Sequence, residues 1–164
     1  MFDPLFAWLE SLAFSIWMRE SPSLFAFPGI LAAHTIGLGL LAGLNGALDL
    51  RLLGAARTIP AAAFTRFLPL MWCGLWLNVL TGIALLVAYP TKALTNPIFH
   101  LKLGLIAVSL LLLRAILQRV RASEPPRAVK WLAVASLIGW AATITAGRLL
   151  AYTCSRLMVD EICS

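Results

Sequence analysis

Residues 29–46 read GILAAHTIGLGLLAGLNG, an apolar stretch that begins and ends on glycine and contains one imidazole, His34. It lies in a longer apolar run, from about residue 27 to 48, which is long enough to cross a lipid bilayer. A titratable side chain in such a run is costly to place in lipid, and for that reason it marks a candidate functional site. We therefore expect a transmembrane helix whose distinctive residue is His34.

The composition extends this expectation to the whole chain. Of its 164 residues, 61% are hydrophobic and 12% are charged, whereas soluble domains carry about 25% charged residues. The net charge of +6 comes from basic residues that lie mostly between apolar runs, a pattern typical of membrane topology rather than of nucleic-acid binding. The chain has no Walker loop, GxGxxG, HExxH or CxxC motif, so an independent enzyme is not expected.

Three more membrane-length runs follow the first, at about residues 67–88, 97–113 and 129–151. Residues 1–20 are too short and too polar to span, and their helical spacing of polar groups predicts an amphipathic helix in the interface. The predicted fold is thus all-α: a four-helix transmembrane bundle (residues 21–151) with an N-terminal interfacial helix. Residues 152–164 form a short tail, where Cys154 and Cys163 could form a disulfide in an oxidising compartment.

Basic residues are concentrated in two of the three connections. The connection 89–96 carries only Lys92, while 49–66 and 114–130 carry Arg51, Arg57, Arg66, Arg114, Arg119, Arg121, Arg127 and Lys130. The positive-inside rule places these two connections in the cytoplasm. We expect a multi-pass protein of the bacterial inner membrane with both termini facing outward.

Small and polar residues predict how the helices pack. Gly39 and Gly43 lie opposite His34 on the first helix, and this small-xxx-small spacing predicts the close approach of another helix. In the second run Gly74, Asn78 and Thr81 share a face, which should turn into the bundle.

The only two histidines, His34 and His100, both lie in predicted spans. The two spans run in the same direction, and the histidines follow their helix starts by six and three residues, so their depths differ by about 5 Å. Two imidazoles at similar depth on parallel helices predict a b-type haem between them. Gly37 and Gly104, each about one turn from a histidine, would give room for the ring, and Lys102 and Arg148 would meet its propionates.

Other roles for these residues remain open. His34 could hydrogen-bond Asn78 or Thr81 on the neighbouring helix, and His100 could be an ordinary interfacial residue. Copper is less well matched, because no Met lies beside either histidine. A quinone carbonyl could accept a hydrogen bond from a histidine near one membrane surface, with help from Lys102, Trp76 or Arg148.

Two segments resemble a known group of membrane proteins. They are LNGALDLRLLG (residues 44–54) and LPLMWCGLWLNVLTGIALLVAYPTKALTNPIFHLKLGLI (residues 68–106). Together with His34, they resemble an uncharacterised bacterial four-span family that carries a domain of unknown function. The resemblance covers about residues 20–115, and it extends distantly to copper-resistance D and small cytochrome b membrane domains. The family's usual histidine late in the third span is absent, because residues 111–118 contain none.

These observations predict an accessory membrane subunit, with three functional hypotheses. The first is a subunit of a redox-associated complex that holds haem b and passes electrons to or from quinone. The second is a structural subunit without a cofactor, bound to other membrane subunits within the lipid bilayer and not to nucleic acid. The third is a small transporter; it is disfavoured because no carboxylate is expected inside a span, with Asp49 at the end of one.

Overall fold

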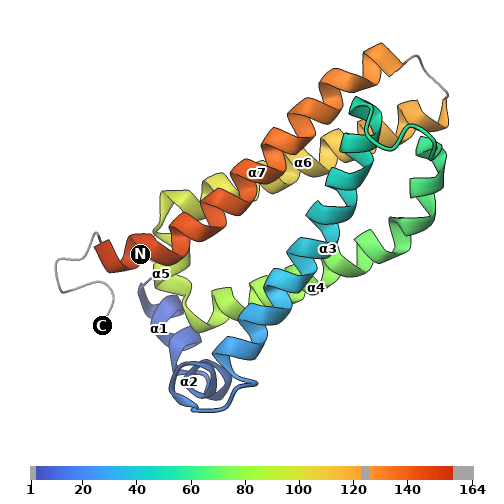
Figure 1. Cartoon of the computed structure of the whole chain (residues 1–164). Coiled ribbons are helices and arrows are strands. Elements are labelled where there is room, and N and C mark those ends of the chain that lie inside the picture. The colour runs from blue at the N-terminus through green and yellow to red at the C-terminus, as the bar shows by residue number, and fades with distance from the viewer. Residues whose placement is uncertain (1–2, 123–125, 157–164) are drawn as a thin grey trace.

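The computed structural model of this chain describes residues 3–122 and 126–156, and every regular element in these ranges is a helix. Four helices are long and apolar enough to cross a membrane, which confirms the predicted fold class (Figure 1). In chain order the helices are α1 (Asp3–Ser11), α2 (Ala13–Glu20), α3 (Phe27–Leu53), the 3₁₀ helix η1 (Ala61–Phe67), α4 (Leu68–Ala88), α5 (Pro90–Leu94), α6 (Pro97–Arg121) and α7 (Pro126–Arg156).

The ends of the long helices follow local signals. Asn96 caps the start of α6, because its side chain accepts a hydrogen bond from the Ile98 backbone N–H at 2.9 Å. The first span is longer than predicted, since α3 continues past residue 48 and ends at Gly54, whose φ of 115° is left-handed. The helix thus includes Asp49, which the sequence prediction placed in a connection.

The far end of the chain is also more helical than expected. α7 runs through Arg156, so residues 152–156 of the predicted tail are helical. The proposed disulfide between Cys154 and Cys163 lies outside the described residues.

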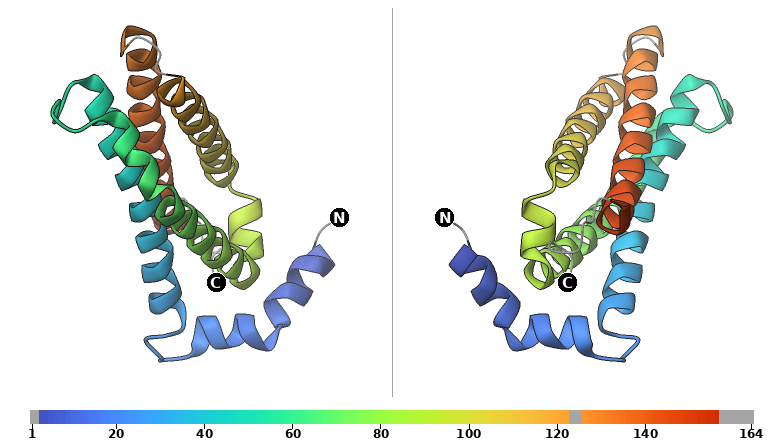
Figure 2. Two further views of the ribbon diagram at one scale, coloured as in Figure 1. Left: turned by 90° about the vertical axis from the view of Figure 1, so that its right-hand side faces the viewer. Right: turned by 90° about the vertical axis from the view of Figure 1, so that its left-hand side faces the viewer.

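The N-terminal segment forms two helices rather than the single predicted one. α1 and α2 lie beyond one end of the long helices, and α2 runs across them (Figure 2). Two polar side chains of α2 face the protein: the Arg19 guanidinium donates to the Ala88 carbonyl at 3.1 Å, and the buried Ser15 hydroxyl donates to the Val87 carbonyl at 3.1 Å. These bonds satisfy carbonyls that the end of α4 leaves without helical partners. The apolar side chains of Phe14 and Trp17 are exposed instead.

The helices pack in the order α4, α3, α7, α6. α3 packs on both α4 and α7, and α6 packs on α7, whereas α4 and α6 do not form a comparable interface over the described residues. α3 and α7 are therefore the two inner helices of this row, and α4 and α6 are the outer ones. The apolar core comprises Leu41, Leu48, Met71, Leu113, Ile116, Val129 and Trp140, with other buried residues around them. Large apolar side chains such as Trp72 and Trp76 point outward, as expected for helices whose solvent is lipid.

The glycines that bring α3 and α4 together are not the predicted pair. A Cβ at Gly37 would lie 2.8 Å from the Gly74 carbonyl oxygen and 2.8 Å from the Asn78 nitrogen. Gly39 and Gly43, by contrast, have no neighbour within 4 Å on that side. The small-xxx-small prediction is therefore wrong for the contacts within this chain, because the face it marks is open.

Candidate functional site

Polar side chains connect α3 to α4 at the level of His34. The Asn78 side chain donates from Nδ2 to the His34 carbonyl at 2.8 Å, and the imidazole Nδ1 lies 3.0 Å from the Thr81 hydroxyl. Gly82 on α4 leaves space beside the ring, since a Cβ there would lie 3.4 Å from the imidazole Cε1. The predicted inward face of α4 is confirmed. Of the two alternatives for the His34 side chain, the imidazole bonds Thr81, whereas Asn78 bonds the backbone carbonyl of His34.

These bonds determine which imidazole nitrogen carries the proton. The Thr81 hydroxyl donates to the Leu77 carbonyl at 2.6 Å, so its oxygen is left to accept from Nδ1–H. The tautomer with hydrogen on Nδ1 leaves Nε2 as an acceptor.

Lys102 reaches this acceptor from α6. Its Nζ lies 3.4 Å from His34 Nε2, and its aliphatic stem passes against Gly147 on α7, where a Cβ would lie 3.6 Å from the Lys102 Cε. An ammonium has three N–H donors and no acceptor. One of the three is directed at the imidazole, and among the described residues no carboxylate pairs with Lys102. We call His34, Asn78, Thr81 and Lys102 the His34 cluster.

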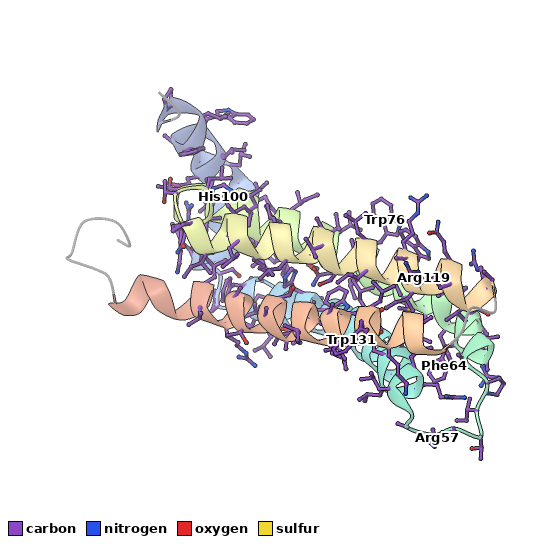
Figure 3. The ribbon with its side chains drawn as sticks, turned by 90° about the horizontal axis from the view of Figure 1, so that it is seen from above. Arg57, Phe64, Trp76, His100, Arg119 and Trp131 are labelled. Atoms are coloured by element: carbon purple, nitrogen blue, oxygen red, sulfur yellow. The ribbon has the colours of Figure 1, made fainter. Side chains whose placement is uncertain are left out.

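Three other predicted site residues lie outside this cluster. His100 is exposed, its Nε2 lies 3.0 Å from the Leu94 carbonyl oxygen, and its ring packs on Phe99; Figure 3 places it near one end of α6. Gly104 faces open space, and Arg148 is exposed. Of the predicted cofactor residues, only His34 and Lys102 are in contact.

Nδ1 of His34 bonds Thr81, and Nε2 is the nitrogen that an axial histidine would offer to iron. In this structure Nε2 lies 3.4 Å from Lys102 Nζ. The missing side chain of Gly37 gives room to the α4 backbone. The haem between His34 and His100 stays a prediction. Over the described residues, there is also no group of three His, Cys, Asp or Glu side chains that could hold a metal ion.

A second polar cluster lies deeper in the bundle and was missed by sequence reasoning. The Asn45 side chain donates from Nδ2 to Asp49 Oδ2 at 2.9 Å and to the Ser136 hydroxyl at 2.7 Å, and all three residues are 0% exposed. We call these three residues the Asp49 cluster. Two atoms of this cluster, Asn45 Oδ1 and Asp49 Oδ1, are buried and have no hydrogen-bond partner among the described residues. The i, i+4 spacing of Asn45 and Asp49 is the sequence signal for this cluster, but a carboxylate at the end of an apolar run also predicts a helix boundary.

The burial of Asp49 also removes the main argument against transport. That argument rested on the expectation that no carboxylate lies inside a span, but Asp49 is fully buried within α3.

Comparisons with known proteins identify no relative: no family model, no curated protein and no solved structure matches this chain.

Proposed function

We propose that this chain is a membrane subunit of a redox-associated complex, and that its His34 cluster binds the headgroup of a quinone. The observation that carries the proposal is the pair formed by Lys102 Nζ and His34 Nε2, which are 3.4 Å apart between membrane-length helices. Lys102 has donors to spare, and no carboxylate among the described residues neutralises it.

This pair matches both redox states of a quinone. A quinone oxygen accepts hydrogen bonds, and the Lys102 ammonium supplies a donor for it. A quinol hydroxyl donates, and the imidazole Nε2 supplies the acceptor, because Thr81 holds the tautomer. The ligand would come from the lipid phase, so the site does not need an aqueous entrance.

The proposed orientation of the helices in the membrane is inferred from the positions of the basic residues. Arg57 and Arg119 lie at the same end of the long helices, opposite the end near His100 (Figure 3). The positive-inside rule assigns this end to the cytoplasm. The His34 cluster then lies in the outer half of a bacterial inner membrane, with both termini outward. The sequence resemblance to bacterial four-span membrane proteins supports the same location.

The proposal is tested by titrating the detergent-purified protein with a short-chain quinone and with its quinol, and following the quenching of tryptophan fluorescence. Lys102→Met should weaken binding of the quinone about tenfold or more, since a hydrogen bond to a charged group contributes about 1.5–3 kcal/mol. His34→Ala should weaken binding of the quinol, whose hydroxyl donates to Nε2, about two- to tenfold, since a neutral hydrogen bond contributes about 0.5–1.5 kcal/mol. The matched controls are His100→Ala and Lys92→Met, which remove the same residue types outside the cluster and should not change Kd. Equal affinity in all four variants would exclude the site.

The same preparation tests the haem hypothesis. A reduced-minus-oxidised spectrum with a b-type α-band that disappears in both His34→Ala and His100→Ala would favour haem over the proposed quinone site.

A structural subunit without a cofactor is the second candidate. The observation in its favour is the open face at Gly39 and Gly43, which a helix of another subunit could approach closely. Native mass spectrometry of gently extracted membranes should then show this chain in a larger assembly, whereas a cofactor-free monomer would count against this candidate.

A further inference from the structure

α3 carries a second titratable side chain, Asp49, that the proposed function does not use. Its carboxyl group is 0% exposed and lies within a helix long enough to span a membrane. Asn45, one turn earlier on the same helix, donates to its Oδ2 at 2.9 Å. Ser136 on α7 accepts a second hydrogen bond from the same amide nitrogen at 2.7 Å. The carboxyl group is therefore held at the interface between α3 and α7.

The two unpartnered oxygens of the cluster are the atoms that a protonated Asp49 carboxyl would join by a hydrogen bond. Within the described part of the chain, Asp49 Oδ1 and Asn45 Oδ1 are both buried acceptors without a hydrogen-bond partner, and a buried acceptor of this kind costs free energy. A neutral carboxylic acid and an amide side by side form two hydrogen bonds: amide N–H to acid oxygen, and acid O–H to amide oxygen. The first is present. A proton on Asp49 Oδ1 supplies the second and satisfies both acceptors.

Charge leads to the same conclusion, because among the side chains that the structure describes no basic group bonds the Asp49 carboxyl. The basic groups on the surrounding elements make other contacts or are exposed. The Arg51 guanidinium donates to the carbonyls of Arg57 and Ile59, and Arg66 lies over the Phe67 ring. Arg114 and Lys130 are exposed, and Arg119 interacts with another residue. The titratable side chain of α4 is that of Cys73, which is exposed. Among the described residues, none of these groups bonds the carboxyl of Asp49, and a buried group in this situation is neutralised rather than left charged.

We propose that Asp49 is a proton-binding site inside the bundle. Its Oδ1 carries the proton and donates it to Asn45 Oδ1, while Nδ2 of Asn45 joins Asp49 to Ser136. Release of the proton places an uncompensated anion between α3 and α7. The packing of these two helices is thereby coupled to pH, independently of the His34 cluster.

The test is the pH dependence of stability in detergent. The folded state holds a proton that the unfolded state releases above mildly acidic pH, so stability should fall as pH rises toward and through neutrality. In this range the unfolding constant should increase by up to about tenfold per pH unit for one proton. Asp49→Asn resembles the neutral acid and should fold with most of this slope removed. Glu20→Gln, which neutralises an exposed carboxylate on α2, is the control and should keep the wild-type slope.

Two results would overturn the proposal. One is an unchanged slope in Asp49→Asn. The other is stabilisation of the wild-type protein by Na⁺ relative to choline at constant pH, lost in Asp49→Asn, because it would show that a metal cation neutralises the carboxylate.

A second measurement needs no variant and covers the case in which Asp49→Asn does not fold. The chain has three aspartates, at positions 3, 49 and 160. Infrared spectra of protein with ¹³C-labelled aspartate carboxyls should show an isotope-shifted band of a protonated carboxyl at neutral pH, and absence of that band would contradict the proposal.

Discussion

At the scale of single residues, the account depends on the protonation of one imidazole. His34 is bonded on both sides, and the Thr81 hydroxyl is already committed to the Leu77 carbonyl. Nδ1 of His34 must therefore carry the hydrogen, and Nε2 is the atom that meets Lys102 or a ligand.

This tautomer is directly observable. The chain has two histidines, so ¹⁵N-histidine NMR with His100→Ala for assignment gives an unambiguous signal for His34. We expect the Nδ1–H form in the wild-type protein. Thr81→Val, which keeps the shape but removes the acceptor, should release this preference, whereas Thr81→Ser should keep it. An Nε2–H tautomer in the wild-type protein would contradict the described bond network.

At the scale of helices, two pairs of glycines in α3 and α4 should respond to substitution in opposite ways. Gly37→Ala and Gly74→Ala place a Cβ less than 3.0 Å from the facing backbone, and overpacking of this kind costs about 1–3 kcal/mol. Gly39→Ala and Gly43→Ala meet open space and should be neutral or stabilise the helix by up to about 1 kcal/mol. Thermal unfolding in detergent measures the difference. If instead the second pair is the destabilising one, the helix interface has been assigned to the wrong face.

The two N-terminal helices should depend on Arg19. Its guanidinium bonds the Ala88 carbonyl of α4 and, at 2.7 Å, the Glu10 carbonyl of α1. Arg19→Gln removes charged hydrogen bonds that contribute about 1.5–3 kcal/mol each at most. We expect faster hydrogen exchange in residues 3–20 with little change in α3 or α4, and no change in the neighbouring variant Glu20→Gln. Uniformly faster exchange over all helices would show that α1 and α2 do not open separately.

At the scale of the whole molecule, the sequence predicts those properties that each helix has by itself, namely its length and the face that it turns inward. Four apolar runs of membrane length predicted four spans, and helical periodicity placed Asn78 and Thr81 on the face that meets His34. Which helices pair depends on how two surfaces fit together, and the pattern of a single helix does not contain this information. The sequence therefore predicts a helix contact at Gly39 and Gly43, whereas the close contact lies at Gly37 and Gly74. It also predicts that His100 lies near His34, whereas His100 bonds the Leu94 carbonyl. A charged residue type at the end of an apolar run predicts a helix boundary, whereas here the Asp49 side chain is buried in the helix beside Asn45 and Ser136.

The central claim is that His34 and Lys102 form one ligand site, and a double-mutant cycle of quinol binding tests it most directly, because a quinol hydroxyl can donate to His34 Nε2 and accept from the Lys102 ammonium. Kd would be measured for the wild-type protein, His34→Gln, Lys102→Met and the double variant. Residues that share a ligand show coupling of about 0.5–3 kcal/mol, so the double variant should bind little more weakly than the weaker single variant. Losses that simply add, or single variants with wild-type affinity, would contradict the claim.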